Sequence, residues 1–274
     1  LVGSEMCIRD RDKITKAMVT AFVKEHGLNP KDDSEAFEHF ANFCILSKDY
    51  SDNFDVTDIW TGGGNDLGID GVATIVNGSL VDTTDAIDDL IKANGYLEVT
   101  FICIQAKSGG NFDSGEFGNF AFGVRDFFSD KPQLQRNENI QAACDLQRHV
   151  YENGSFLTRG RPTCKLYYVT TGKWQDDPNF VGRIRTEKET QEKMGLFEFV
   201  DITPVDADRV QKLYNASKNK ITSEVTFSTK VALPDIDGVK EAYLGYLPVL
   251  EYLKLILDES GPVSYTHLTL PTKA

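Results

Sequence analysis

The sequence has few cysteines, and no two of them are spaced for a metal site. Five occur among 274 residues, and no Cys-x-x-Cys pair is present, which argues against a zinc site and against a disulfide framework. The four histidines show no metal-ligand spacing. Four cysteines lie far apart, mostly in apolar segments, and predict buried free thiols in a reducing, cytoplasmic compartment: Cys44, Cys103, Cys144 and Cys164.

The sequence also lacks a long apolar run and an excess of basic charge. No run approaches the ~20 apolar residues of a membrane-spanning helix, so we expect no membrane partner. Lys and Arg number 29 against 42 Asp and Glu, for a formal net charge of -13. A basic field normally supplies non-specific affinity for nucleic acid. Any phosphate contact therefore has to use a local basic cluster, a bound cation, or parts of the protein outside this sequence.

Two common catalytic motifs are missing as well. The glycine-rich stretch 61–68 has no Gly-Lys-Ser/Thr after it and leads into a predicted strand, so it is not a P-loop. No Gly-x-Ser-x-Gly elbow occurs, which argues against an α/β-hydrolase nucleophile.

The two ends look like adapter sequence. Residues 6–10, Met-Cys-Ile-Arg-Asp, can be encoded ATG TGT ATA AGA GAC. The reverse complement of that DNA encodes Val-Ser-Tyr-Thr-His, which stands at residues 263–267. Such an inverted repeat resembles the translated mosaic end of a transposase-based sequencing adapter. We therefore expect residues 1–11 and 262–274 to be adapter-derived and set them aside from fold reasoning.

Hydrophobic periodicity predicts an alternation of helices and strands. Asp32 and Glu35 form a capping box for a second helix, and Asn77-Gly78 predicts a hairpin. The alternation after residue 96 favours an α/β sheet covered on both faces. The predicted helices cover 12–25, 32–44, 115–128, 137–151, 179–194, 206–216 and 249–257, and 83–93 is either a short helix or a loop. The predicted strands cover 69–76, 96–106, 165–171, 196–202, 221–231 and 239–247.

Three polar residues stand where two of these strands would meet. Asp70 stands at the start of the strand over 69–76, Gln105 stands at the end of the strand over 96–106, and Lys107 directly follows it. Side chains on a strand alternate between faces, so Gln105 and Lys107 share one face. An amide at the end of so apolar a strand needs a partner. Side-by-side pairing of the two strands would bring Asp70 to both residues.

This grouping has the chemistry of a metal-dependent phosphodiesterase. A hard cation such as Mg²⁺ takes oxygen ligands and keeps several waters. Asp70 can supply a charged oxygen, Gln105 a neutral one, and Ala106 its carbonyl. Glu38, beside the buried stripe of the second helix, can reach the same pocket directly or through a water. Lys107 is then placed to orient or deprotonate the attacking water, or to stabilise charge on phosphorus.

The order helix Glu, then Asp, then Gln-x-Lys resembles the PD-(D/E)xK nuclease superfamily. With Gly-Ile-Asp-Gly at 68–71, it is most similar to the Mrr-like restriction endonucleases. The wider context, including 112–128, resembles the N-terminal part of the AIPR (abortive phage infection) proteins. Ile69 stands where the superfamily has its proline, and Gln105 replaces an acid, so the metal site has one charge fewer. The resemblance covers roughly residues 30 to 170 and continues more weakly to about 257.

The resemblance implies a restriction-endonuclease-like α/β fold with a mixed central sheet flanked by helices. It places a nuclease core at 12–175 and a truncated α/β extension at 176–261. The implied activity is Mg²⁺-dependent (or Mn²⁺-dependent) endonucleolytic cleavage of DNA in bacterial anti-phage defence. Two alternatives stay open: an RNA nuclease, and an inactive nuclease-fold module that binds nucleic acid or a protein partner. A homodimer also stays open. The implied catalytic residues are Glu38, Asp70, Gln105 and Lys107, and the implied metal ligands are Glu38, Asp70, Gln105 and Ala106.

Overall fold

In the computed structural model, a five-stranded sheet of order β2-β1-β3-β4-β5 is the centre of the fold. β1 runs antiparallel to β2 and β3, whereas β3, β4 and β5 are parallel. The predicted class, α/β with a mixed central sheet flanked by helices, is confirmed. The strands are β1 (Gly71–Val76), β2 (Ser79–Val81), β3 (Val99–Lys107), β4 (Thr163–Thr170) and β5 (Phe199–Val205).

The structure describes residues 2–158, 160–218, 229–232, 243–251, 257–258 and 261–262, with side chains described at 13–158, 160–218, 229, 231 and 244–251. The helices follow the predicted apolar periodicity. Within the described part of the chain, none has the length and apolar character that crossing a membrane requires. They are α1 (Val2–Glu25), α2 (Asp33–Asp49), η1 (Val56–Ile59), α3 (Thr84–Asn94), α4 (Ser114–Phe127), α5 (Glu138–Glu152), η2 (Gly154–Phe156), α6 (Pro178–Lys193) and α7 (Ala207–Lys218).

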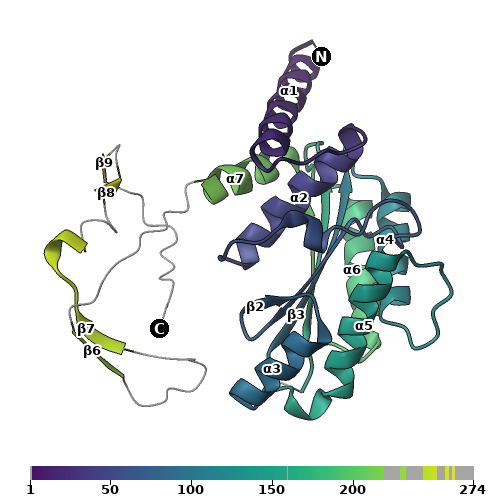
Figure 1. Cartoon of the computed structure of the whole chain (residues 1–274). Helices are drawn as coiled ribbons and strands as arrows, with labels where there is room; N and C mark the ends of the chain where they lie inside the picture. The colour runs from purple at the N-terminus through teal and green to yellow at the C-terminus, as the bar shows by residue number, and fades with distance from the viewer. Residues whose placement is uncertain are drawn as a thin grey trace. The chain divides into compact units, whose positions relative to one another are not determined.

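Helices cover both faces of the sheet (Figure 1). One hydrophobic core lies between the sheet and α3, α4, α5 and α6, and a second lies between the sheet and α1, α2 and α7. Alternation along β3 divides the strand between them: Phe101 and Cys103 face the first core, and Ile102 and Ile104 face the second. The four cysteines outside the N-terminal segment are buried and free, as predicted: Cys44, Cys103, Cys144 and Cys164.

Local signals in the sequence set several element ends. The Asp32 carboxylate caps α2 by accepting bonds from the Ser34 and Glu35 amides at 2.9 Å each. The β1–β2 hairpin turns through Asn77 and Gly78, which have φ of 51° and 80°. Positive φ at both central residues is the geometry that Asn-Gly favours. The hairpin brings the chain back so that β1 lies between β2 and β3.

The chain divides into two compact units, Leu1–Ser217 and Lys218–Ala274. The boundary predicted after residue 175 falls inside the first unit, because β5 pairs in parallel with β4 and α6 packs on the same sheet. α1 begins within the segment expected to be adapter-derived, and residues 263–274 lie outside the described residues.

The second unit contains short strands. β6 (Thr229–Ala232) pairs with β7 (Tyr243–Tyr246), and β8 (Leu257–Asp258) pairs with β9 (Gly261–Pro262). β6 overlaps the end of the strand predicted over 221–231, and β7 lies within the strand predicted over 239–247. Most of the first of these predicted strands lies outside the described residues. The helix predicted over 249–257 is described only at 249–251, and Leu257 belongs to β8.

A close contact at Gly123 holds α4 against the glycine-rich stretch before β1. A Cβ added there would lie 1.7 Å from the Leu67 carbonyl oxygen. In an ordinary helix position, by contrast, alanine is more favourable than glycine. The absence of a side chain at Gly123 therefore has a packing reason.

We expect Gly123→Ala to lower the free energy of unfolding by about 1–3 kcal/mol, because the helix must move off the turn. The matched control is Gly182→Ala in α6, where an added Cβ meets nothing within 4 Å. That change should raise the free energy of unfolding by up to ~1 kcal/mol through helix propensity. Urea denaturation measures both. Equal effects of the same sign would contradict the packing argument.

Candidate active site

Asp70 lies just before β1 and is tied to the end of β3. Its amide donates to the Ile104 carbonyl at 2.8 Å, which continues the β1–β3 ladder past Gly71. Its side chain is only 5% exposed. Oδ2 accepts two hydrogen bonds, from Gln105 Nε2 at 2.5 Å and from the Ala106 amide at 2.8 Å. The carboxylate is therefore held by the strand on which the predicted Gln-x-Lys pair stands.

Asp70, Gln105 and Lys107 share one face of the sheet. Gly71 pairs with Ile104 and Val72 with Cys103, so the next position outward sets Asp70 opposite Gln105. Val72 and Cys103 belong to the core under α4 to α6. Because faces alternate along a strand, Asp70, Gln105 and Lys107 all lie on that side.

Glu38 approaches from α2, which covers the other face. The Trp60 indole Nε1 donates to Glu38 Oε2 at 3.0 Å. Gly62 makes room for this pair, since an added Cβ would lie 2.6 Å from Glu38 Oε2 and 2.7 Å from the indole nitrogen. Burial raises the pKa of Glu38, while the Trp60 hydrogen bond and the charge of Lys31 lower it.

Neighbouring charged groups act on the Asp70 carboxyl through space. Burial, followed by the negative charge of Glu38, raises the pKa of Asp70 to about 7. The hydrogen bond from the Ala106 amide and the ammonium of Lys107 oppose that rise, and Asp66 adds to it. The structure thus brings Glu38, Asp70, Gln105 and Lys107 into one neighbourhood.

The glycine-rich turn forms one wall of this neighbourhood. Asp66 accepts from the Gly68 amide at 2.8 Å, and Asn137 Nδ2 donates to the Thr61 and Gly64 carbonyls at 2.8 and 3.1 Å. Gly68 has a φ of 69°, and an added Cβ would lie 3.3 Å from Gln105 Oε1. The turn is therefore a fixed part of the site and not a loose loop.

Gln105 presents its amide nitrogen to Asp70, while its oxygen lies toward Gly68. The sequence predicted a neutral oxygen ligand at this position. In the structure the Gln105 nitrogen donates to Asp70, and the role of its oxygen as a metal ligand stays a prediction. The physical reason is the buried carboxylate, which needs donors.

The oxygens present fit a magnesium ion better than a metal held entirely by protein ligands. Mg²⁺ binds through one or two carboxylates and keeps several waters. Asp70 has Oδ1 beyond its two bonds at Oδ2, Glu38 supplies a second carboxylate, and the backbone of Ala106 faces Asp70. Over the described ranges, no group of three or more His, Cys, Asp or Glu is arranged to hold a metal ion.

Three residues that contact or influence Glu38 and Asp70 were not predicted from the sequence: Asn42, Trp60 and Asp66. Trp60 holds Glu38, Asp66 raises the pKa of Asp70, and Asn42 Nδ2 donates to the Asp70 carbonyl at 2.8 Å. Asn42 stands four residues after Glu38, on the same side of α2. That spacing was a usable signal.

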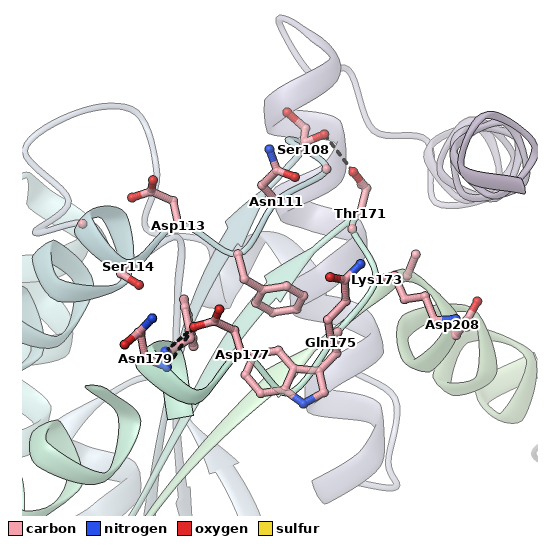
Figure 2. Close-up of a pocket in the computed structure, with 17 residues that line it drawn as sticks. Ser108, Asn111, Asp113, Ser114, Thr171, Lys173, Gln175, Asp177, Asn179 and Asp208 are labelled. Carbon is pink, nitrogen blue, oxygen red and sulfur yellow. Dashed lines mark hydrogen bonds between the residues drawn. The ribbon is translucent and has the colours of Figure 1, made fainter. Parts of the chain in front are cut away.

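A cavity of about 870 Å³ opens directly after Lys107 (Figure 2). It lies at the carboxyl ends of β3 and β4, between the loops that lead to α4 and α6. Its aromatic part is built on Phe112, Trp174 and Phe180. The charged residues that line it are Asp113, Asp177, Asp208 and Lys173. Three carboxylates against one ammonium make it a poor place for a phosphate backbone.

The raised pKa of Asp70 makes stability fall with pH. Below about pH 4 the carboxyl is protonated in both the folded and unfolded states. Between about pH 4 and 7 the folded state keeps a proton that the unfolded state has released, so the free energy of unfolding decreases as pH rises. Above that window the loss is complete.

We therefore expect Asp70→Asn, without divalent cations, to unfold with a free energy about 1–4 kcal/mol higher than wild type at pH 8. The gap should close toward pH 4. Urea denaturation across this range measures it, with Asp145→Asn on the surface of α5 as control. A gap that does not change between pH 5 and pH 8 would rule out the burial of an ionisable Asp70.

Comparison with known proteins adds no assignment to this geometry. The chain matches no family model, no curated protein and no solved structure.

Proposed function

We propose that this chain is a Mg²⁺-dependent (or Mn²⁺-dependent) endonuclease that hydrolyses DNA in the bacterial cytoplasm, in abortive-infection defence against phage. One observation carries the proposal. Asp70, Gln105 and Lys107 lie on one face at one end of the β1–β3 pair, with the Glu38 carboxylate close enough to raise the pKa of Asp70. The link to defence rests on the resemblance to AIPR proteins.

The charges of the site support a cation there. The negative charges of Glu38 and Asp66 raise the pKa of Asp70, and the ammonium of Lys107 lowers it. A divalent ion would relieve that repulsion and, when bound, would polarise the phosphate and lower the pKa of a bound water. It would also bring positive charge to a chain whose formal net charge is -13.

The chain's own residues have separate tasks. Asp70 and Glu38 would hold the cation, while Gln105 and the Ala106 amide fix the Asp70 carboxylate by hydrogen bonds. Lys107 ends β3 on the same face and is only partly buried. In this proposal its ammonium orients the attacking water or stabilises charge on the phosphate oxygens.

A second candidate is a nuclease-fold module without catalysis, which binds nucleic acid or a protein partner. Two observations favour it: the net charge of -13 and the Gln105 amide nitrogen turned toward Asp70. RNA remains the alternative substrate, because phosphodiester hydrolysis by this chemistry does not depend on the sugar. A homodimer is compatible with either candidate.

Cleavage assays separate these candidates. We expect Mg²⁺-dependent cleavage of duplex DNA that stops with EDTA and with Asp70→Ala. Lys107→Ala should reduce the rate at least ~100-fold. Lys173→Ala is the matched control, because it removes an ammonium from the neighbouring cavity and should cleave like wild type. Cleavage at the wild-type rate by both site variants would refute the assignment, and RNA of the same sequence tests the substrate.

Metal binding is measured separately by calorimetric titration with Mn²⁺. The nuclease proposal expects one ion per chain, and Asp70→Asn should weaken that binding at least ~10-fold because it removes a charged ligand. Glu116→Gln, near the cavity, is the control. A wild-type chain that binds no ion would favour the non-catalytic module.

A further inference from the structure

Asn42 ties helix α2 to the backbone of Asp70. Its side chain is fully buried, and Nδ2 donates to the Asp70 carbonyl oxygen at 2.8 Å. Glu38 stands one helical turn earlier on α2, so both residues lie on the same side of the helix. One helix therefore presents the Glu38 carboxylate to the site and holds the main chain that carries the second carboxylate.

The geometry of this contact leaves no alternative arrangement of the amide. The Asp70 carbonyl can only accept, so the nitrogen of Asn42 must face it. Asn42 Oδ1 is buried and has no hydrogen-bond partner in the described part of the chain. Buried acceptors without a partner are rare. An apolar side chain would fill the same space without one, so the amide at position 42 needs another reason, which is its bond to Asp70.

Gly71 is shaped to this contact. A Cβ on Gly71 would lie 2.3 Å from Asn42 Oδ1 and 2.6 Å from its Cγ and Nδ2. All three neighbours belong to the same amide, so any side chain at position 71 would displace it. The Gly-Ile-Asp-Gly stretch thus ends in glycine where α2 must come close.

Repulsion acts against this arrangement. The negative charge of Glu38 disfavours ionised Asp70, and burial disfavours it further. Asp70 directly precedes β1, and Glu38 stands on α2. The Asn42 bond joins those two elements, and the Thr61 amide, at 3.2 Å from the Asp70 carbonyl, tethers it only to the preceding turn.

We propose that Asn42 is a positioning residue that fixes the Asp70 carboxylate against β3 and at a set separation from Glu38. It acts through the Asp70 main chain and touches no substrate. Its importance for cation binding rests on the proposed function, whereas its effect on Asp70 itself does not. An aspartate at this position would lack the donor when ionised, and a glutamine would be too long for the space beside Gly71.

A matched control exists elsewhere in the core. Gln191 is also fully buried, donates from Nε2 to the Ala121 carbonyl at 3.1 Å, and has an Oε1 without a described partner. It joins α6 to α4 and not α2 to β1. Asn42→Leu and Gln191→Met each remove one amide bond to a buried carbonyl, so a purely structural role predicts the same behaviour for both.

Amide hydrogen exchange tests the inference without metal or substrate. The Ala106 amide bonds to Asp70 Oδ2, so its protection reports the position of that carboxylate. The reference is the Asn77 amide, which bonds to Glu98 at the other end of the same strand pair. In Asn42→Leu, Ala106 should exchange about tenfold faster relative to Asn77, and in Gln191→Met the ratio should stay at the wild-type value.

The Gly71→Ala change forms a double-mutant cycle with a substitution of Asn42. Alone it should speed Ala106 exchange as Asn42→Leu does, because the added methyl displaces the amide. In an Asn42→Ala background it should add little, since the amide it strikes is gone. If Asn42→Leu and Gln191→Met give the same Ala106 ratio, the positioning role is wrong.

Mg²⁺ dependence of cleavage then tests the link to function. Asn42→Leu should raise the Mg²⁺ concentration for half-maximal rate at least ~10-fold, and excess Mg²⁺ should restore much of the maximal rate. A wild-type chain without cleavage or ion binding would refute the proposed function and leave the exchange result to decide on Asn42. If the wild-type chain cleaves DNA but Asn42→Leu leaves the Mg²⁺ dependence of cleavage unchanged, Asn42 has no role in cation binding.

Discussion

The burial of one carboxylate, that of Asp70, constrains everything around it. Taking an ionisable group out of water disfavours its charged form, and here burial and neighbouring charge raise the pKa of Asp70 to about 7. Two donors from β3, the Gln105 amide and the Ala106 main chain, partly offset that penalty. To make its bond, the Gln105 side chain directs its nitrogen toward Asp70.

Close approach of the main chain at three glycines to neighbouring groups is the second structural requirement. Gly62, Gly71 and Gly123 each stand where a methyl group would strike a neighbour: Glu38 Oε2, the Asn42 amide and the Leu67 carbonyl. Two of these contacts bring α2 to the site, and the third brings α4 to the glycine-rich turn. Helices on opposite faces of the sheet, α2 and α4, thus both contact the segments around Asp70. These contacts hold the Asp70 carboxyl in place although neighbouring negative charges disfavour its ionised form.

Charge links this geometry to the proposed activity. An acidic chain has little field to attract nucleic acid, and the cavity beside Lys107 is acidic as well. The negative charges of Glu38 and Asp66 both act on Asp70, and under the proposed function a cation bound there would offset them and contact a phosphate. The negative net charge argues against a protein that binds nucleic acid without a cation. It fits the proposal of a site that acts only when a divalent cation is bound.

The sequence by itself determined the order and type of most elements, through apolar periodicity, the Asp32 cap and the Asn77-Gly78 turn. It also placed Gln105 and Lys107 on one face, because alternation along a strand needs no tertiary information. Tertiary structure decided the rest. β5 joins the sheet beyond the predicted boundary, Trp60 holds Glu38 across 22 residues, and Asn42 reaches Asp70 across 28. These contacts depend on how closely distant segments approach, and no local pattern of residues encodes that distance.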